Sequence, residues 1–144
     1  MKRSLMAVFL GSIIGISGIT FAQEQSFKVV GNSDSTPVTM SKRDLARIFL
    51  KRKSSWPSGR TAVPADQTQN NTLRESFAES VLDRSLDSLE SYWQAQVFSG
   101  KASPPKGLRS DAEVIEFVSK MPGAVGYVSA NAPTAGVTVI SISD

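Results

Sequence analysis

The sequence predicts an α/β domain, a single lobe in which helices flank a small mixed sheet. Short apolar segments typical of strands recur between longer segments whose apolar residues repeat about once per helical turn. This alternation favours helices packed on a sheet over an all-helical or all-strand protein. About 120 residues follow the apolar N-terminal segment, a length that buries a stable core without disulfides.

Four segments are predicted to be strands. Residues 27–30 and 137–142 alternate in polarity, 60–63 leads into a proline, and 124–128 is continuously apolar. The runs predicted to be loops or turns are 31–36, 51–59 and 99–108.

Helix-start signals indicate three of the four predicted helices. Ser41 is a good N-cap with Asp44 three residues later, and Thr72 and Ser110 each begin a capping box with a Glu three residues on. The fourth helix is expected at 86–98. The side chains expected on the inner faces are Leu45, Ile48 and Phe49, then Leu73, Phe77, Val81 and Leu82, then Leu86, Leu89, Tyr92, Trp93 and Val97, then Val114, Phe117 and Val118.

The first 22 residues have the pattern of a secretory signal peptide. Lys2 and Arg3 give a positive start, an apolar run spans 6–19, and Ala22 offers a small residue at the cleavage point. The alternative is a retained N-terminal anchor, but the run is shorter than the about 20 apolar residues that cross a bilayer. We therefore expect a mature domain of residues 23–144, periplasmic or secreted, with no stable membrane anchor.

Removal of the signal peptide leaves a nearly neutral chain. The whole sequence has a formal charge of +3, and without Lys2 and Arg3 it has 14 basic and 13 acidic residues, a charge of +1. Six basic residues still gather between Lys42 and Lys53, either as a solvated helix face or as a surface that attracts anions. No nucleic-acid-binding motif accompanies them, and we expect no nucleic-acid partner.

The residue types that are absent exclude several chemistries. Without Cys and His the chain has no disulfide, no thiol chemistry, no Ser-His-Asp triad and no imidazole metal site. The glycine-rich loops that hold nucleotide phosphates do not occur either. Asp83 and Asp87 share helical spacing, but on a polar face where solvation explains them. We therefore expect a protein that is not an enzyme and has no cofactor or metal.

Residues 62–77 are the most informative segment for function. A short strand leads through a polar loop, predicted at 66–71, into the helix predicted to begin at Thr72. The first N–H groups of a helix lack intrahelical partners and lie at the positive end of its dipole, which favours anion binding. Arg74 adds a two-pronged donor for a phosphate or carboxylate. The alternative is an ordinary capped helix with a solvated Arg74.

Four segments carry a family resemblance, namely SKRDLARIFLKRKSSWPSG (41–59), VPADQ with LRESF (63–77), YWQAQVFSGKASPP (92–105) and SDAEVIEFVSKMPGAVGYVS (110–129). In order and spacing they are similar to the periplasmic substrate-binding proteins of phosphate ABC transporters, particularly the short single-domain members. The last segment is the most specific, because that family ends a helix with Pro-Gly-Ala-Ile/Val-Gly-Tyr-Val. The resemblance covers nearly all of the mature chain and implies one lobe of the type 2 periplasmic-binding fold.

The resemblance also implies a site for phosphate or a related oxyanion. In the full-length family two lobes close over the phosphate, and one wall corresponds to residues 63–77. Asp66 matches the family Asp that accepts a hydrogen bond from a protonated phosphate, whereas Pro64 stands where the family has an Arg. Arg74 matches the short members and is a candidate for the missing cation. The residues implied as ligand-binding are Asp66, Gln67, Asn70, Asn71, Thr72 and Arg74.

Two hypotheses of different classes follow. The first is non-catalytic recognition of the oxyanion, linked to ABC-type phosphate uptake. A single open lobe leaves half of the anion's oxygens in water, so a transporter permease or a second protomer is expected to complete the cleft. The second hypothesis is a protein-interaction or assembly module that keeps the fold and has lost the ligand. Pro64 and the run QTQNNT, which replaces the family's Ser-Gly-Thr signature, favour that alternative.

Overall fold

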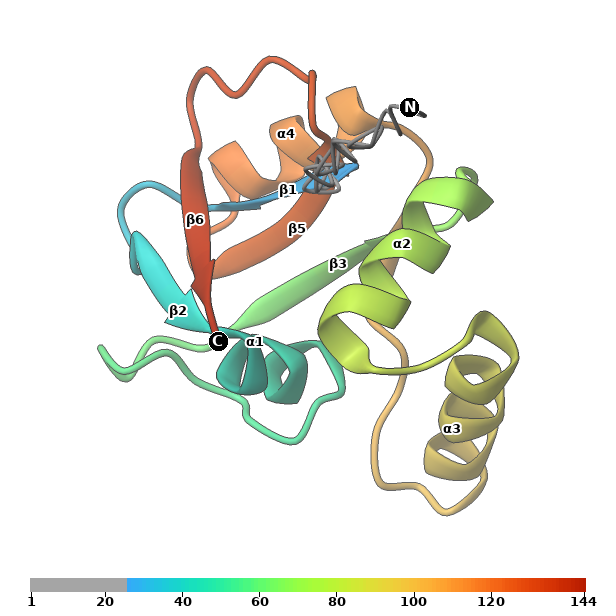
Figure 1. Cartoon of the computed structure of the whole chain (residues 1–144). Helices are drawn as coiled ribbons and strands as arrows, with labels where there is room; N and C mark the ends of the chain where they lie inside the picture. The colour runs from blue at the N-terminus through green and yellow to red at the C-terminus, as the bar shows by residue number, and fades with distance from the viewer. Residues whose placement is uncertain (1–25) are drawn as a thin grey trace, which may run out of the picture.

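A computed structural model describes residues 26–144 (Figure 1). The elements in this part of the chain are β1 (Phe27–Gly31), β2 (Thr39–Ser41), α1 (Lys42–Phe49), β3 (Val63–Gln67), α2 (Asn71–Leu82), α3 (Leu86–Phe98), β4 (Lys106–Leu108), α4 (Asp111–Lys120), β5 (Ala124–Ser129) and β6 (Thr138–Ser143). The predicted signal peptide, residues 1–22, lies outside the described residues. Within those residues, no helix has the length and apolar character to cross a bilayer.

The strands form one mixed sheet in the order β2-β6-β1-β5-β3-β4. β1 lies antiparallel to β5 and β6, whereas β3 runs parallel to β5 and β4. The prediction of a mixed sheet flanked by helices is confirmed. Because β3 and β1 run in opposite directions, the carboxyl end of β3, which leads into α2, lies at the opposite end of the sheet from the carboxyl end of β1.

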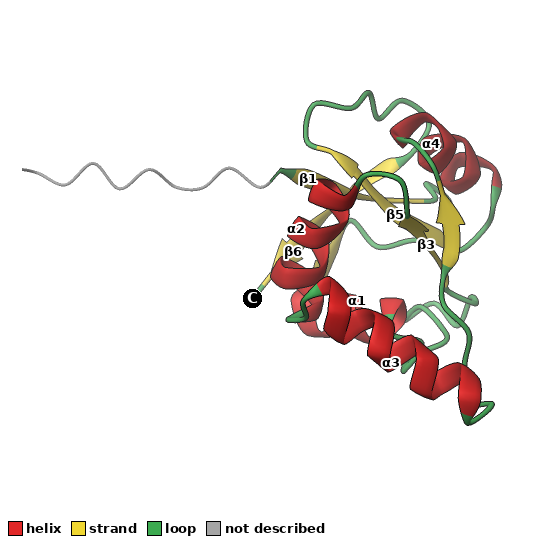
Figure 2. Ribbon diagram, turned by 90° about the vertical axis from the view of Figure 1, so that its right-hand side faces the viewer, coloured by secondary structure: helices red, strands yellow, loops and turns green. Residues whose placement is uncertain are grey.

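Alternate residues of the central strands face two separate cores. In β5, Val125 and Tyr127 join the core under α1 and α2, whereas Ala124 and Val128 join the core under α4. Successive strand residues point to opposite faces, so a sheet covered on both sides needs such a continuous apolar run. Figure 2 shows α4 on one side of the sheet and α1 and α2 on the other.

α3 lies beyond α2, farther from the sheet (Figures 1 and 2). Its buried residues, Leu89 and Trp93, extend the core of α1 and α2, so Trp93 is a core residue as expected. The Tyr92 hydroxyl donates to the Leu50 carbonyl at 2.6 Å and ties α3 to the end of α1. The prediction that Val97 lies on the inner face was wrong. The last turn of α3 lies at the periphery of the domain and leaves Val97 56% exposed.

The sheet contains two strands that the sequence did not predict. β2 and β4 have three residues each, too few for an apolar period to be recognised, and β4 lies inside the predicted loop 99–108. β4 pairs in parallel with the second half of β3. The predicted strand 60–63 was thus misplaced: β3 begins at Val63, where it pairs with Ala124 of β5, and the pairing with β4 extends it through Gln67.

Candidate anion-binding site

The carboxyl end of β3 holds the first two candidate residues. Asp66 and Gln67 pair in register with Gly107 and Leu108 of β4, so the prediction of a loop that starts at Asp66 was wrong. The loop between β3 and α2 is only 68–70. Successive strand side chains point to opposite faces, and here Asp66 reaches α2 whereas Gln67 reaches the start of α4.

The helix cap of α2 is Asn70. Its Oδ1 accepts a hydrogen bond from the Leu73 N–H at 3.2 Å, and Thr72 is the second residue of the helix. The predicted capping box at Thr72 was therefore wrong, since Asn is the stronger cap and occurs two residues earlier. The first intrahelical bond runs from the Arg74 N–H to the Asn70 carbonyl at 2.9 Å. The N–H groups of Asn71 and Thr72 thus have no intrahelical partner and lie at the positive end of the dipole.

Two side chains hold the Asp66 carboxylate. Arg74 Nε donates to Asp66 Oδ2 at 2.8 Å, and the Tyr127 hydroxyl donates to Oδ1 in a short hydrogen bond. The Asp66 and Arg74 side chains are only 13% and 25% exposed, so water screens their attraction less than that of a surface pair. Within residues 26–144, the two Nη groups of Arg74 make no hydrogen bond, which leaves them as donors for a further acceptor.

Tyr127 is itself held in place on both its ring and its hydroxyl. Its ring stacks on Phe77 of α2 with centroids 4.0 Å apart and an interplanar angle of 8°, and its hydroxyl accepts from the Gln67 N–H at 3.2 Å. Burial, together with the negative charge of Asp66, raises the pKa of Tyr127 well above its ordinary value. The phenol is therefore a neutral donor at physiological pH, and it orients Asp66 toward α2.

Gln67 belongs to a separate cluster on the other face of the sheet. Its buried Nε2 donates to Asp111 Oδ1 at 2.9 Å and to the Tyr127 carbonyl at 3.3 Å. Asp111 Oδ1 also accepts from the Ser129 N–H at 3.0 Å. Burial alone would raise the pKa of Asp111, but these hydrogen bonds hold it below its ordinary value. The structure thus separates the Gln67 side chain from the other five candidate residues.

The space beside Asp66 and Arg74 is small. A cavity of about 10 Å³ lies there, walled on its other sides by apolar side chains of α1, α2 and α3 and by Pro105. Such a volume holds about one water molecule. It does not hold a phosphate, so any oxyanion at this end of β3 lies on the open surface at the start of α2.

Pro64 is buried in β3, in register with Val125 of β5. A side chain at this position cannot supply the guanidinium that the resemblance implies. The guanidinium next to Asp66 comes instead from Arg74, one turn into α2. This cation was predicted from the sequence, but its contact with Asp66 was not.

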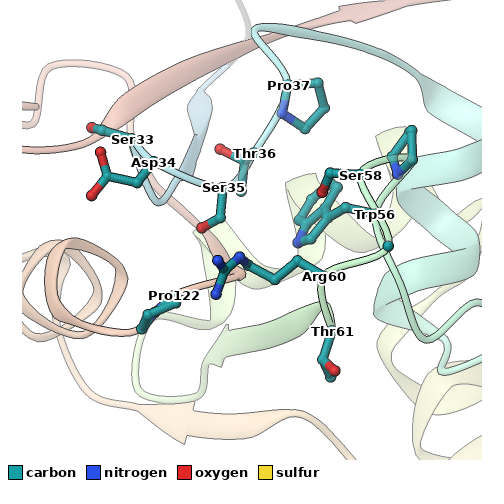
Figure 3. A pocket seen from close by; sticks show the side chains of 12 residues that line it. Ser33, Asp34, Ser35, Thr36, Pro37, Trp56, Ser58, Arg60, Thr61 and Pro122 are labelled. Atoms are coloured by element: carbon teal, nitrogen blue, oxygen red, sulfur yellow. The ribbon is translucent and has the colours of Figure 1, made fainter.

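A wider groove of about 820 Å³ lies at the opposite end of the sheet (Figure 3). It is lined by the loop 33–37, the turn 56–61 and Pro122, and it contains none of the candidate residues. Some of its polar groups support the loop. Ser35 Oγ, for example, donates to Asn32 Oδ1 and accepts from the Gly123 N–H, both at 2.7 Å. We therefore place the candidate site at the start of α2.

The sequence did not single out Tyr127 or Asp111. One signal was present for Tyr127, because a Tyr within an otherwise apolar buried strand needs a partner for its hydroxyl. The partner, 61 residues earlier in the chain, follows only from the pairing of β3 beside β5. Asp111 carries no local signal beyond its place in the first turn of α4.

No protein-family model and no curated protein matches this sequence. Solved structures do match. The chain is similar to an ABC-type phosphate transport receptor from Vibrio cholerae (TM-score 0.63, 16% identity, 83% of this chain and 47% of that one). It is also similar to PstS from Borrelia burgdorferi (TM-score 0.62, 14% identity, 83% and 47%). The third structure is a phosphate ABC transporter substrate-binding protein from Clostridium perfringens with bound phosphate. It matches with a TM-score of 0.64 and 11% identity, and the match covers 81% of this chain and 44% of that one.

The chain spans less than half the length of each of these proteins. The matched region nevertheless takes in most of this chain, 83% of it for the Vibrio cholerae receptor. The chain therefore shares the fold of the matched part of these phosphate ABC transporter substrate-binding proteins, as the sequence resemblance implies.

Proposed function

We propose that this chain is a periplasmic or secreted domain that recognises phosphate or a related oxyanion without catalysis. The observation that carries the proposal is the contact of Arg74 with Asp66 at the start of α2, in a fold shared with phosphate receptors. Residues 1–22 act as a cleaved signal peptide in this proposal, and residues 23–144 form the mature domain.

The site offers donors of three kinds to an oxyanion. These are the N–H groups of Asn71 and Thr72 at the helix start, the Thr72 hydroxyl, and the Nη groups of Arg74. Asp66 is compatible with an anion because Arg74 offsets its charge. A carboxylate has about four acceptor positions, and the two that Tyr127 and Arg74 occupy leave others for the proton of a monoprotonated phosphate.

The described site is one wall of a cleft. An oxyanion on the open surface at the start of α2 keeps much of its hydration and meets only a few donors. We propose that an ABC transporter permease or a second protomer supplies the opposite wall, and that the domain serves ABC-type uptake. The full length of the similar proteins, more than twice the matched part, supports the need for such a wall.

Isothermal titration of the mature protein with phosphate, sulfate and arsenate at low salt tests binding. We expect saturable heat for at least one of these anions at millimolar concentration, and weaker binding for Arg74→Ala. The matched control is Arg60→Ala, which removes an exposed arginine at the other end of the sheet and should leave the heat unchanged. Absence of heat with all three anions would contradict the proposal.

A second function, an assembly module that has lost the ligand, is favoured by one specific observation. Both carboxylate oxygens of Asp66 have protein partners, and the adjacent cavity of about 10 Å³ is too small for phosphate. This alternative predicts that Arg74→Ala and Asp66→Asn leave the cellular function intact when the protein remains folded. A loss of function confined to these two substitutions would count against it.

A further inference from the structure

A second, strongly charged surface lies at the other end of α2. Lys42, Arg43 and Arg47 of α1 and Arg52 of the following turn line a groove of about 610 Å³, which we call the basic groove. Its remaining wall is the end of α2 at Val81 and Leu82, together with two acidic residues, Asp83 and Asp144, against the four cations. α2 has 12 residues, so at 1.5 Å per residue its two ends are about 18 Å apart. The basic groove is therefore distinct from the site at Asp66 and Arg74.

The chain's own carboxylates neutralise this surface only in part. Lys42 pairs with Asp83 at 3.1 Å, and Asp44 is shared between Arg47 at 3.8 Å and Lys53 at 3.6 Å. The remaining cations of the segment are Arg43, Lys51 and Arg52, which have no carboxylate within 4.0 Å in the described part of the chain. The mature chain is nearly neutral, so this local excess of positive charge is a specific feature of the surface.

Arg52 is held in place by an aromatic ring. Its guanidinium carbon lies 5.4 Å from the Tyr92 ring centroid, and that of Arg84 lies 4.8 Å from the same centroid. Stacking on the ring restricts the guanidinium groups before any ligand binds. Two like charges beside one ring repel each other, and a carboxylate next to them offsets that repulsion.

The floor of the basic groove is apolar. Ala46, which is half-buried, lies between Arg43 and Arg47 on α1, and the buried Leu50 follows one turn later beneath it. Arg43 and Arg47 are exposed and stand one helical turn apart, about 6 Å along the axis. A ligand that matches this pattern has negative groups at a similar spacing and apolar groups between them.

We propose that the basic groove binds an acidic amphipathic segment of a partner protein. Carboxylates one turn apart on such a segment pair with Arg43 and Arg47, a further acidic group meets Arg52, and small apolar side chains cover Ala46. A nucleic-acid backbone or a lipid headgroup layer supplies the negative charge but leaves the apolar floor uncovered. The concave shape between α1 and α2 also suits a single segment better than a flat bilayer.

The test uses the full mature chain and a short fluorescein-labelled helical peptide with Glu at every fourth position and Leu and Ala between. Fluorescence anisotropy is measured at about 10 and about 150 mM salt, since exposed charge pairs are screened over this range. The comparison ligands are the same peptide with Gln for Glu, a DNA duplex and phosphatidylglycerol vesicles. We expect binding of the Glu peptide that weakens with salt, and at least about tenfold weaker binding of the other three ligands.

The variant Arg43→Glu/Arg52→Glu should weaken binding of the Glu peptide by about tenfold or more. Neither residue takes part in an ion pair within the described chain, so the fold should be retained. The control Arg60→Glu/Lys101→Glu has the same change of charge at exposed positions outside the groove and should bind like the unmodified protein. Equal losses in the two variants, tighter binding of DNA or vesicles, or no peptide binding at low salt would each overturn the proposal.

Discussion

Asp66 connects the proposed ligand chemistry to the stability of the domain. Its carboxylate is held by Tyr127 from the sheet and by Arg74 from α2, so one group fixes the orientation of the other two. The neutral phenol provides a hydrogen bond without a competing charge. The guanidinium is thereby positioned before an anion arrives, which lowers the entropic cost of binding.

Tyr127→Phe tests this arrangement. The change removes the donor to Asp66 and the acceptor of the Gln67 N–H, and it should lower the free energy of unfolding by about 1–3 kcal/mol near neutral pH. The raised folded-state pKa means that the neutral phenol stabilises the fold fully below pH 10.0 and that this contribution is lost as the pH rises above it. Urea denaturation across this range should show a steeper alkaline decline for the unmodified protein than for the variant. Parallel declines would contradict the role of Tyr127.

The contribution of Asp111 to the stability of the fold depends on pH in the opposite direction. Its folded-state pKa is below the ordinary value of 3.8, so its contribution is present above pH 3.8 and is lost as the pH falls through the lower folded-state value. In acid denaturation followed by circular dichroism, Asp111→Asn should show a flatter stability curve below pH 3.8. A variant curve as steep as that of the unmodified protein would refute this assignment.

Single residues of the site were predictable where their role is local. Arg74 was identified from its place in the first turn of a helix, and that placement is confirmed. The roles of Tyr127 and Asp111 depend on side chains that meet across strands far apart in sequence, and a local pattern does not contain that information. The same limit applies to Gln67, whose partner is set by α4 on the far face of the sheet.

At the scale of elements, the junction between β3 and α2 determines what the site can offer. β4 extends β3 through Gln67 and shortens the following loop to 68–70. Asn70 then caps α2, two residues before the cap at Thr72 that the sequence pattern indicates. As a result Thr72 lies in the first turn of the helix, where its N–H is free of intrahelical bonds.

A pair of substitutions distinguishes the cap from the candidate ligand residue. Asn70→Ala removes the acceptor for the Leu73 N–H and should cost about 1 kcal/mol of stability. Thr72→Ala should change stability by less than about 0.5 kcal/mol, yet it should weaken oxyanion binding. Chemical denaturation and titration calorimetry on both variants measure the two effects. A larger loss of stability in Thr72→Ala than in Asn70→Ala would contradict the observed cap.

Most elements were predictable because their signals are local. α3 has the predicted bounds of 86–98, and the Ser110 hydroxyl accepts from the Glu113 N–H as the capping pattern indicates. β2 and β4 were missed because each owes its strand conformation to a neighbouring strand, β6 and β3 respectively. Three-residue strands of this kind are products of tertiary pairing, and their own composition gives little indication of them.

At the scale of the whole molecule, the arrangement of the sheet and its helices limits where a ligand can bind. Both faces of its sheet are covered by helices, so the ends of the strands are the places where a ligand can approach. The fold was predictable because several independent segments agreed in order and spacing. The sequence could not predict whether this chain carries all the ligand-binding residues of the site, because the similar proteins are more than twice as long as the region that it matches.

The isolated domain should accordingly bind phosphate weakly, with a dissociation constant of about a millimolar, because one wall leaves much of the anion in water. If a second protomer completes the cleft, phosphate should shift the protein toward a dimer in analytical ultracentrifugation, and the apparent affinity should rise with protein concentration. If a permease completes it, affinity should be independent of protein concentration. Micromolar affinity in a strict monomer would contradict the one-wall account.

The central claim is that an oxyanion binds at the start of α2 beside Arg74. The most direct measurement is a titration of the ¹⁵N-labelled mature protein with phosphate, followed by NMR with the Arg side-chain Nε–H resonances resolved. We predict saturable shifts of the Asn71 and Thr72 amides and of the Arg74 Nε–H, with little change at Arg60 or in the basic groove. Shifts confined to the basic groove, or none at millimolar phosphate, would contradict the account.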